Sequence, residues 1–364
     1  MGVLLVDPRR GGPDFDGILL FRAHLRREIM SERNSISRRK AMRGLGAGLI
    51  AAAASRGFAA EGTAAGDSLV RAKLQDPVSK YPKPPFKSQS QPWPGLASKM
   101  DPRPDHGEES YRGSGRLSGR KALVTGGDSG MGRAAAIAFA REGADVAINY
   151  YPTEEPDAQE VIALIQSAGQ KGIPLPGDLR EELFCQKLVL DAFNALGGLD
   201  ILVSNAARQQ SHASLLDIST EQFDWTIKTN IYAPFWIIKA ALPHLPPGSV
   251  IIGTTSVQAY NPSPDLYDYA QTKAATMNYV KSLAKQLAPK GIRVNGVAPG
   301  PIWTPLQVSG GDSQEKLQNF GSQTPLGRPG QPAELASIYV QLAANDASYA
   351  TGQIYGAAGG SGQP

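Results

Sequence analysis

Short β-rich runs alternate with longer helical stretches from Lys121 to the end of the chain, and this alternation constrains the fold most. The candidate strands are ALVT (122–125), DVAINY (145–150), GIPLPG (172–177), ILVSN (201–205), SVIIGT (249–254), RVNGVA (293–298) and GQIYG (352–356). Helical patterns such as GRAAAIAFAREG and EELFCQKLVLDAFNALGG lie between them. Strands joined by crossover helices form a parallel sheet that helices cover on both faces. We therefore expect a doubly wound, mostly parallel α/β sheet of about seven strands in a single domain.

A glycine-rich turn, TGGDSGMGRA, follows the first of these strands directly. Its glycines permit backbone angles and close approaches that a side chain would obstruct. The free N–H groups and the positive dipole end of the following helix would then bind a pyrophosphate. Because the turn lies between a strand and a helix, it is a candidate dinucleotide-binding turn, and a glycine-rich loop without a ligand is the alternative. The candidate cofactor-binding residues of this turn are Gly126, Asp128, Ser129, Gly130, Met131 and Gly132.

The type of residue at the end of the second strand indicates whether such a turn would bind NAD or NADP. An acidic residue there binds the ribose hydroxyls of NAD and repels the additional phosphate of NADP. Asn149 and Tyr150 occupy this position and Tyr151 follows them, so the site has neither a carboxylate nor an arginine. The sequence therefore predicts NAD or NADP as the cofactor and leaves the choice between them open.

The segment YDYAQTK (267–273) contains two tyrosines and a lysine. On a helix Tyr269 lies about 40° from Lys273, whereas Tyr267 lies about 240° from it. A phenol with a pKa of about 10 is a poor base at neutral pH, and a nearby ammonium together with the positive nicotinamide of an oxidised cofactor lowers that pKa. We therefore expect Tyr269 to exchange a proton with an alcohol or carbonyl oxygen, and Lys273 to lower the pKa of the phenol.

The spacing G-x-x-x-G-x-G and the tyrosine–lysine pair resemble the short-chain dehydrogenase/reductase family, whose members have a Rossmann fold. Ser256 lies thirteen residues before Tyr269 and just past a strand, as the family's serine does. The resemblance implies that Ser256 hydrogen-bonds the substrate oxygen. It also implies that Asn230, in TIKTNIYAPF, holds a water that links Lys273 to solvent. The candidate catalytic residues are therefore Ser256, Tyr269, Lys273 and Asn230.

The same resemblance implies cofactor contacts outside the glycine turn. GDL places Asp178 at the end of the third strand, where the family contacts adenine. SNAA (204–207) departs from the family's Asn-Asn-Ala-Gly run at its first and last residues. After the sixth strand, Ile302 and Thr304 match positions that contact the nicotinamide carboxamide. The implied contacts are Asn149, Tyr150, Asp178, Leu179, Asn205, Ala206, Tyr269, Lys273, Pro299, Gly300, Ile302 and Thr304.

The resemblance covers roughly residues 118–360. Within the family, the sequence is similar to a bacterial branch of glucose/ribitol-type dehydrogenases. The resemblance implies an NAD(P)-dependent oxidoreductase acting on CH–OH donors, which interconverts a secondary alcohol and a carbonyl compound such as a small alcohol, sugar or aldehyde. We interpret the polar residues 301–328 as a lid over that small-molecule substrate. The family also implies a homotetramer. A non-catalytic dinucleotide-binding sensor is the alternative, but the chain retains all four candidate catalytic residues.

Residues 1–60 predict a targeting leader that lies outside the fold. They contain 11 Lys/Arg and 5 Asp/Glu, so the chain's net charge of +4 becomes −2 in the remainder, which argues against a nucleic-acid surface. Arg38 and Arg39 precede an apolar stretch over residues 44–54, an order typical of a twin-arginine signal peptide. We therefore expect the protein to be exported to the periplasm. If the leader does not function, the protein is expected in the cytoplasm.

Two further points about the leader stay open. Its apolar run is shorter than the ~20 residues that span a bilayer, so we expect no stable membrane insertion, and an uncleaved anchor is the alternative. The true start is Met1 or Met30, because Met30 would give a leader of ordinary length.

Residues 61–118 form a proline-rich arm before the α/β domain of residues 119–364. The arm shows neither helical nor strand periodicity, and a flexible linker is one interpretation. Tyr81, Phe86 and Trp93 are apolar anchors by which the arm could instead lie along the body or a neighbouring subunit. The four histidines lack metal-ligand spacing, and the single Cys185 excludes an intramolecular disulfide and is typical of a core thiol.

Overall fold

The computed structural model describes residues 74–361, and the leader predicted over residues 1–60 lies outside them. The described residues contain a seven-stranded sheet with the order β3-β2-β1-β4-β5-β6-β7, in which every neighbouring pair is parallel. The strands are β1 (Lys121–Thr125), β2 (Asp145–Tyr150), β3 (Gly172–Pro176), β4 (Ile201–Ser204), β5 (Val250–Thr254), β6 (Arg293–Pro299) and β7 (Ile354–Ala357). This confirms the predicted doubly wound fold.

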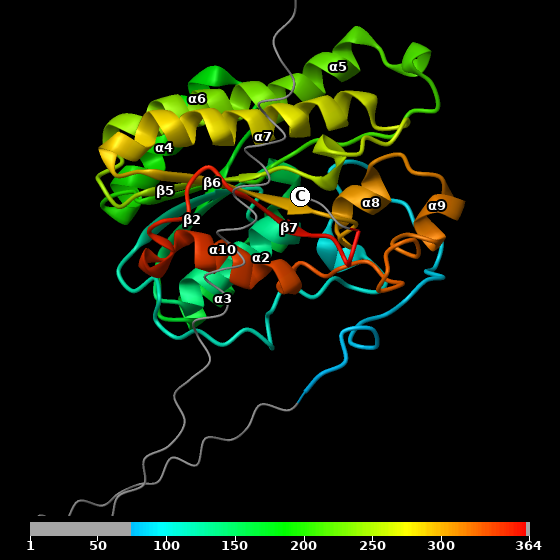
Figure 1. Cartoon of the computed structure of the whole chain (residues 1–364), viewed down its shortest axis with the longest axis horizontal. Helices are drawn as coiled ribbons and strands as arrows, with labels where there is room; N and C mark the ends of the chain where they lie inside the picture. Colours follow the sequence, from blue (N-terminus) through cyan, green and yellow to red (C-terminus); the bar gives the residue numbers. More distant parts are fainter. Residues whose placement is uncertain (1–73, 362–364) are drawn as a thin grey trace, which may run out of the picture. The chain divides into compact units, whose positions relative to one another are not determined.

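Helices cover both faces of the sheet (Figure 1). They are α2 (Gly130–Arg141), α3 (Glu155–Ser167), α4 (Glu182–Leu196), α5 (Thr220–Ile227), α6 (Ala233–Ala241), α7 (Tyr267–Leu287), α8 (Pro305–Ser309), α9 (Gln314–Gln318) and α10 (Ala333–Ala343). Helices α2, α3 and α10 pack on one face, and α4, α6 and α7 pack on the other. The short 3-10 helices are η1 (Ala97–Lys99), η2 (Pro152–Glu154), η3 (Leu215–Asp217), η5 (Leu242–His244), η6 (Val257–Ala259), η7 (Ala288–Lys290) and η8 (Asn345–Ala347), and η4 (Lys228–Tyr232) is a π-helix.

The alternation of side chains along β1 explains why both faces need a helical cover. Ala122 and Val124 belong to the core beneath α2, α3 and α10, whereas Leu123 belongs to the core beneath α4, α6 and α7. All three side chains are fully buried. A strand that is apolar on both faces is stable only between two layers of helices.

The predicted strand positions agree with the structure to within two residues. The largest difference is at β7, which begins at Ile354 instead of Gly352. Gly352 has a φ of +74° and lies in the turn before the strand. Cys185 of α4 is buried and its Sγ donates to the carbonyl oxygen of Leu179, as expected for a core thiol.

The described part of the arm, residues 74–118, lies along the body of its own chain. Phe86 stacks on Trp303, with ring centroids 4.3 Å apart, inside a small apolar cluster. The indole N–H of Trp303 donates to the carbonyl oxygen of Pro102, and the N–H of Ala97 donates to Asp157. Residues 61–73 lie outside the described part of the chain, so the predicted boundaries of the arm stay predictions.

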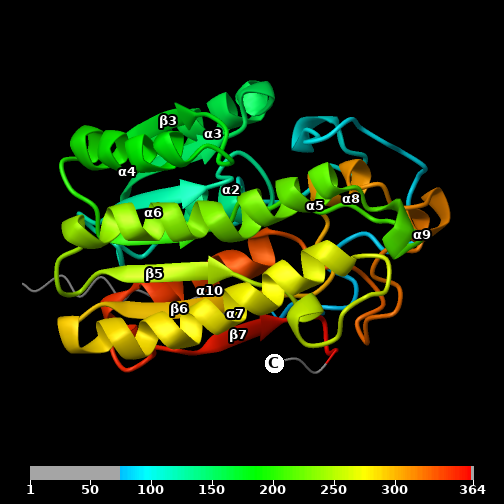
Figure 2. The same ribbon diagram turned by 90° about the horizontal axis from the view of Figure 1, so that it is seen from above.

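This arm reaches the region beside α8 and α9, at the end of the molecule where the strands of the sheet end (Figure 2). Residues 301–328 contain α8 and α9 and bury Trp303, Val308 and Leu317 against Phe86 and Met100 of the arm. Their predicted role as a lid over the substrate stays a prediction.

Candidate functional site

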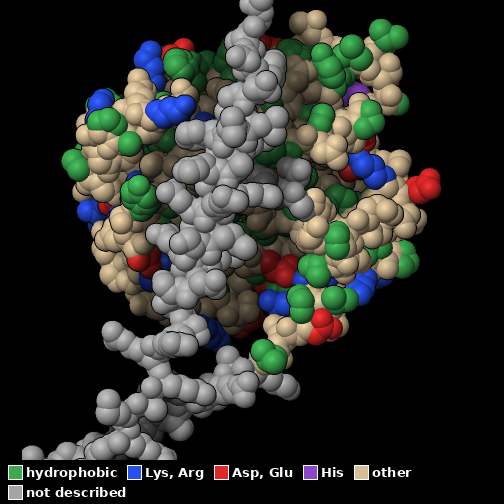
Figure 3. Space-filling model, viewed as in Figure 1, with side chains coloured by type: hydrophobic (Ala, Val, Ile, Leu, Met, Phe, Trp, Pro, Cys, Tyr) green, Lys and Arg blue, Asp and Glu red, His purple; other side chains and the backbone are tan. Residues whose placement is uncertain are grey.

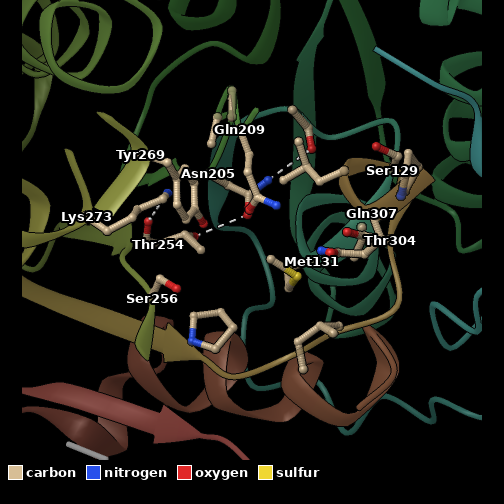
Figure 4. Close-up of a pocket in the computed structure, with 18 of the residues that line it drawn as sticks. Ser129, Met131, Asn205, Gln209, Thr254, Ser256, Tyr269, Lys273, Thr304 and Gln307 are labelled. Atoms are coloured by element: carbon tan, nitrogen blue, oxygen red, sulfur yellow. Dashed lines mark hydrogen bonds between the residues drawn. The ribbon is translucent and has the colours of Figure 1, made fainter. Parts of the chain in front are cut away.

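A pocket of about 550 Å³ opens at the carboxyl ends of the strands. The strand order reverses between β1 and β4, and such a switch point in a parallel sheet leaves a crevice for a ligand. Every candidate site residue lines this pocket except Gly132 and Asn230. Figure 4 shows Tyr269, Lys273 and Ser256 on one side of it, and Ser129 and Thr304 on the opposite side.

The glycine turn forms a close backbone cradle between β1 and α2. Gly126 has a φ of +61° and Gly130 a φ of +52°, a region that residues with side chains rarely adopt. A Cβ on Gly132 would lie 1.9 Å from the carbonyl oxygen of Gly126, so only glycine fits there. Asn205 fixes the turn from the neighbouring strand, because its side-chain amide donates to the carbonyl oxygens of Thr125 and Gly126.

An acidic side chain of this turn lacks a hydrogen-bond partner. Asp128 lines the pocket, and its Oδ2 is buried without a partner among the described residues. Burial raises the pKa of Asp128 to about 6 and also raises that of the adjacent Glu154. A buried acceptor without a protein partner is available to a hydrogen-bond donor of a ligand in the pocket. The cradle and this acceptor together fit a dinucleotide.

The expected adenosine contacts surround the ends of β2 and β3. Tyr150 and Asn149 end β2, and Asp178 and Leu179 follow β3. Burial alone would raise the pKa of Asp178, but hydrogen bonds from Arg180 hold it below its usual value. The carboxylate of Asp178 is therefore charged and already paired.

The candidate catalytic residues Ser256, Tyr269 and Lys273 meet after β5 and in the first turns of α7. Tyr269 and Lys273 are 7 % and 4 % exposed, and the ammonium of Lys273 lies 5.4 Å from the centre of the Tyr269 ring. The Ser256 hydroxyl lies near enough to the phenol of Tyr269 to lower its pKa slightly, and its Oγ accepts the N–H of Gln258. Tyr267 is 47 % exposed and does not line the pocket, so Tyr269 is the tyrosine that lies beside Lys273, as the helical spacing predicts.

Burial raises the pKa of Tyr269 in this structure to about 12, and the neighbouring Ser256 hydroxyl opposes this shift only in part. The Nζ of Lys273 donates to the carbonyl oxygen of Thr254 at 2.8 Å instead of to the phenol. The lowering that we expect from the ammonium and an oxidised nicotinamide together stays a prediction. Burial also lowers the pKa of Lys273, to about 8.

Asn230 lies behind this group and does not line the pocket. It belongs to the π-helix η4, where the helix is locally distorted, as is frequent at functional sites. Its Oδ1 accepts the N–H of Arg208, and its Nδ2 donates to the carbonyl oxygen of Arg208 and to Thr272 Oγ1. Asn230 is thus connected to the residue next to Lys273, and its predicted role as a water relay stays a prediction.

The segment after β6 closes the remaining side of the pocket. A Cβ on Gly300 would lie 2.7 Å from the Cα of Ala358, so the chain can turn there only because residue 300 is a glycine. Thr304 is buried and approaches the glycine turn, since a Cβ on Gly130 would lie 3.3 Å from its Cγ2. Pro299 and Ile302 line the pocket with them.

Comparisons with known proteins agree with this geometry. The family model described as enoyl-(acyl carrier protein) reductase matches residues 126–361. An uncharacterised oxidoreductase of Escherichia coli K12 is 56 % identical over 287 residues, which cover 79 % of this chain and 98 % of the relative. The chain belongs to the short-chain dehydrogenase/reductase family.

Two further members of this family are similar to the chain. The glucose and ribitol dehydrogenase of Daucus carota is 44 % identical over 282 residues, 76 % of this chain and 96 % of the relative. A short-chain dehydrogenase of Burkholderia cenocepacia, crystallised with NADP, is 33 % identical with a TM-score of 0.63 and covers 67 % of this chain and 98 % of its own. The chain is thus an oxidoreductase of this family. The prediction of NAD or NADP agrees with that complex, and the choice between them stays open.

Sequence reasoning missed several residues that line the pocket of this dehydrogenase/reductase. Trp93 was predicted only as an anchor of the arm, and Trp225 and Gln209 were not singled out. The tryptophan between two prolines in the arm was the available signal. Among residues 74–361 no cluster of metal-ligating side chains occurs, and no helix of that part has the length and apolar character to cross a bilayer.

Proposed function

We propose that this protein is an NAD(P)-dependent oxidoreductase that interconverts an alcohol and its carbonyl compound, with Tyr269 as the acid/base residue. The observation that carries the proposal is the meeting of Ser256, Tyr269 and Lys273 on the side of the pocket opposite the glycine turn. A nicotinamide bound there supplies or accepts a hydride. The glycine turn, the ends of β2 and β3, Asn205 and the segment after β6 would hold the cofactor.

The proton chemistry follows from the burial of the phenol. With a pKa of about 12, Tyr269 is protonated at neutral pH, so it donates its proton to a carbonyl oxygen during reduction. Ser256 donates a hydrogen bond to the same oxygen and stabilises the charge that develops on it. Lys273 is largely charged below a pKa of about 8, and its ammonium stabilises the phenolate that remains. Oxidation of an alcohol uses the same groups in reverse.

The substrate class rests on two supports. The similarity to a glucose and ribitol dehydrogenase favours a polar alcohol or sugar, and we place the chain in that branch. Gln209, Gln258 and Gln307 also line the pocket and supply amide donors and acceptors for hydroxyl groups. The proposed substrate is therefore a small secondary alcohol, sugar or aldehyde and its redox partner.

A screen of small alcohols, sugars and carbonyl compounds, with each form of NAD and NADP tested separately, examines this proposal. We expect turnover, followed by the absorbance of the reduced nicotinamide, with at least one polar pair. Binding of the dinucleotide without turnover of any compound would contradict the proposed oxidoreductase activity and would favour a non-catalytic dinucleotide-binding sensor.

We also propose that the leader directs export through a twin-arginine route and that the mature protein is a homotetramer. The leader pattern supports the first proposal, and membership of the family supports the second. Fractionation of tagged full-length protein tests the first. Uncleaved protein found only in the cytoplasm would contradict it.

A further inference from the structure

The arm contributes an aromatic side chain to the cofactor pocket. Trp93 lines the pocket although it precedes the whole strand–helix series. Its ring centroid lies 5.1 Å from that of Tyr151, which follows β2, and 5.1 Å from that of Trp225 in α5. The side chain is only partly buried, so part of the indole is exposed next to the pocket.

Two guanidinium groups fix this aromatic cluster. The guanidinium carbon of Arg208 lies 5.2 Å from the centre of the Trp93 ring and 4.1 Å from the centre of the Trp225 ring. The guanidinium carbon of Arg180 also lies 4.1 Å from the centre of the Trp225 ring. Arg208 is 5 % exposed, and its Nε has no partner among the described residues. Cation–π contacts of this kind hold planar groups in fixed positions. The tryptophans are therefore packed between guanidinium groups beside the pocket.

The backbone on both sides of Trp93 is held by the body. The N–H of Gln91 donates to the carbonyl oxygen of Val308, and Ser309 Oγ donates to the carbonyl oxygen of Pro94. Both partners belong to the segment of α8. The backbone next to Trp93 is consequently positioned by the segment that follows β6.

The place of the cluster identifies which part of a ligand it would contact. In a doubly wound sheet the end of the second strand contacts the adenosine ribose of a dinucleotide, and Tyr151 follows that strand directly. We propose that Trp93 forms a wall of the adenosine subsite, so that the arm is part of the cofactor site. This inference rests on the proposed function, because it takes the ligand to be a nicotinamide adenine dinucleotide.

The chemistry of the wall matches an adenine base. Aromatic side chains stack on bases or close a pocket around them, and loss of one such contact weakens binding by roughly 10-fold to 100-fold. The arm is held to the body by contacts of Phe86, Ala97 and Trp303 that do not involve the pocket face of Trp93. Affinity for adenosine compounds therefore depends on a segment outside the α/β domain itself.

The test compares Trp93→Ala with the wild-type full chain by calorimetric titration. The probes are adenosine diphosphate with and without a phosphate on the ribose 2′-hydroxyl. We expect the Kd of the better-bound probe to rise about 10-fold to 100-fold in Trp93→Ala, and Trp93→Phe to restore most of the affinity. In turnover assays the change should lie mainly in the KM of the cofactor rather than in kcat.

Tyr81→Ala is the matched control. Tyr81 is another half-buried aromatic residue of the arm, which donates to Asp105 and does not line the pocket. Its replacement should leave the Kd of the probe unchanged. An equal loss in both variants would overturn the proposal, since general loosening of the arm would then explain it.

The outcomes separate this inference from the proposed function. If Trp93→Ala binds the adenosine probes as tightly as wild type and still turns over its substrate, Trp93 is not a wall of the adenosine subsite, and the proposed function is unaffected. If Trp93→Ala alone loses affinity for the adenosine probes and the wild-type protein turns over no substrate, the role of Trp93 in the adenosine subsite is supported and the proposed function is contradicted.

Discussion

At the scale of single residues, burial controls the protonation of Tyr269 and Lys273. Tyr269 and Lys273 occupy adjacent turns of α7, and both are removed from water. Burial penalises the charged form of each group, so the pKa of the phenol rises and the pKa of the ammonium falls. A charged cofactor or a substrate oxygen beside the pair would shift both pKa values again.

The lowered pKa of Lys273 predicts a specific dependence of stability on pH. Between its folded value of about 8 and its ordinary value of 10.5, the unfolded chain holds a proton that the folded chain has released. Raising the pH through this window therefore favours folding. The free energy of unfolding of the wild type, relative to Lys273→Met, should rise by about 3 kcal/mol across it.

Chemical denaturation of both proteins at several pH values measures this difference. Titrating groups distant from residue 273 contribute equally to both proteins and cancel. A difference that stays constant from pH 8 to pH 10.5 would show that Lys273 keeps its ordinary pKa in the folded protein.

At the scale of elements, the glycine turn and the arm build the pocket in different ways. The turn is a local structure, in which Gly126, Gly130 and Gly132 are required within seven consecutive residues. The arm depends on contacts over long sequence distances, such as Phe86 with Trp303. A local motif can be recognised in a sequence, whereas the partners of an arm become known only from the folded chain.

Gly132→Ala should damage the turn severely. The added Cβ would lie 1.9 Å from the Gly126 carbonyl oxygen and 2.6 Å from Asn205 Nδ2, so the backbone must move. We expect a loss of stability of about 3 kcal/mol and a loss of dinucleotide binding, measured by thermal unfolding and titration calorimetry.

Gly169→Ala is the control for this change. A Cβ there meets nothing within 4 Å, and only its φ of +81° opposes the substitution. It should cost about 1–2 kcal/mol and leave dinucleotide binding intact. Full binding in Gly132→Ala would exclude the turn as the phosphate site.

The sequence predicted the sheet and the candidate site to different extents, and particular residues show why. Strand alternation and the four-residue spacing of Tyr269 and Lys273 are local patterns, and the structure agrees with both. The raised pKa of Tyr269 depends on burial by elements distant in the sequence, which no local pattern reveals. The position of Trp93 depends on Trp225, which lies far along the chain, so no local pattern could reveal it.

On the scale of the whole molecule, the surface is mixed in charge but has exposed apolar side chains on one helical layer. Basic and acidic side chains are interspersed on the face seen in Figure 3. Tyr232 and Phe235 are 46 % and 57 % exposed, and Leu183 and Leu190 of α4 are also exposed. These side chains belong to the layer of α4 and α6, which can be seen from above in Figure 2. A second copy of the chain is the partner that the proposed tetramer would place against such side chains.

The tetramer can be tested with one substitution in this layer. Phe235→Lys would place a charge in the proposed contact, so light scattering should detect a shift from tetramer to smaller species. Leu216→Lys, at a 93 % exposed position of η3, should leave the tetramer intact. A monomeric wild type would contradict the proposed assembly.

The central claim is that Tyr269 transfers the proton, and Tyr269→Phe tests it most directly. The variant loses one hydroxyl and retains the ring that packs beside Lys273. With the substrate identified by the screen, we predict that kcat falls by about 10²-fold to 10⁴-fold while the Kd of the dinucleotide stays within about twofold of wild type. A Tyr269→Phe enzyme with wild-type kcat would contradict the mechanism.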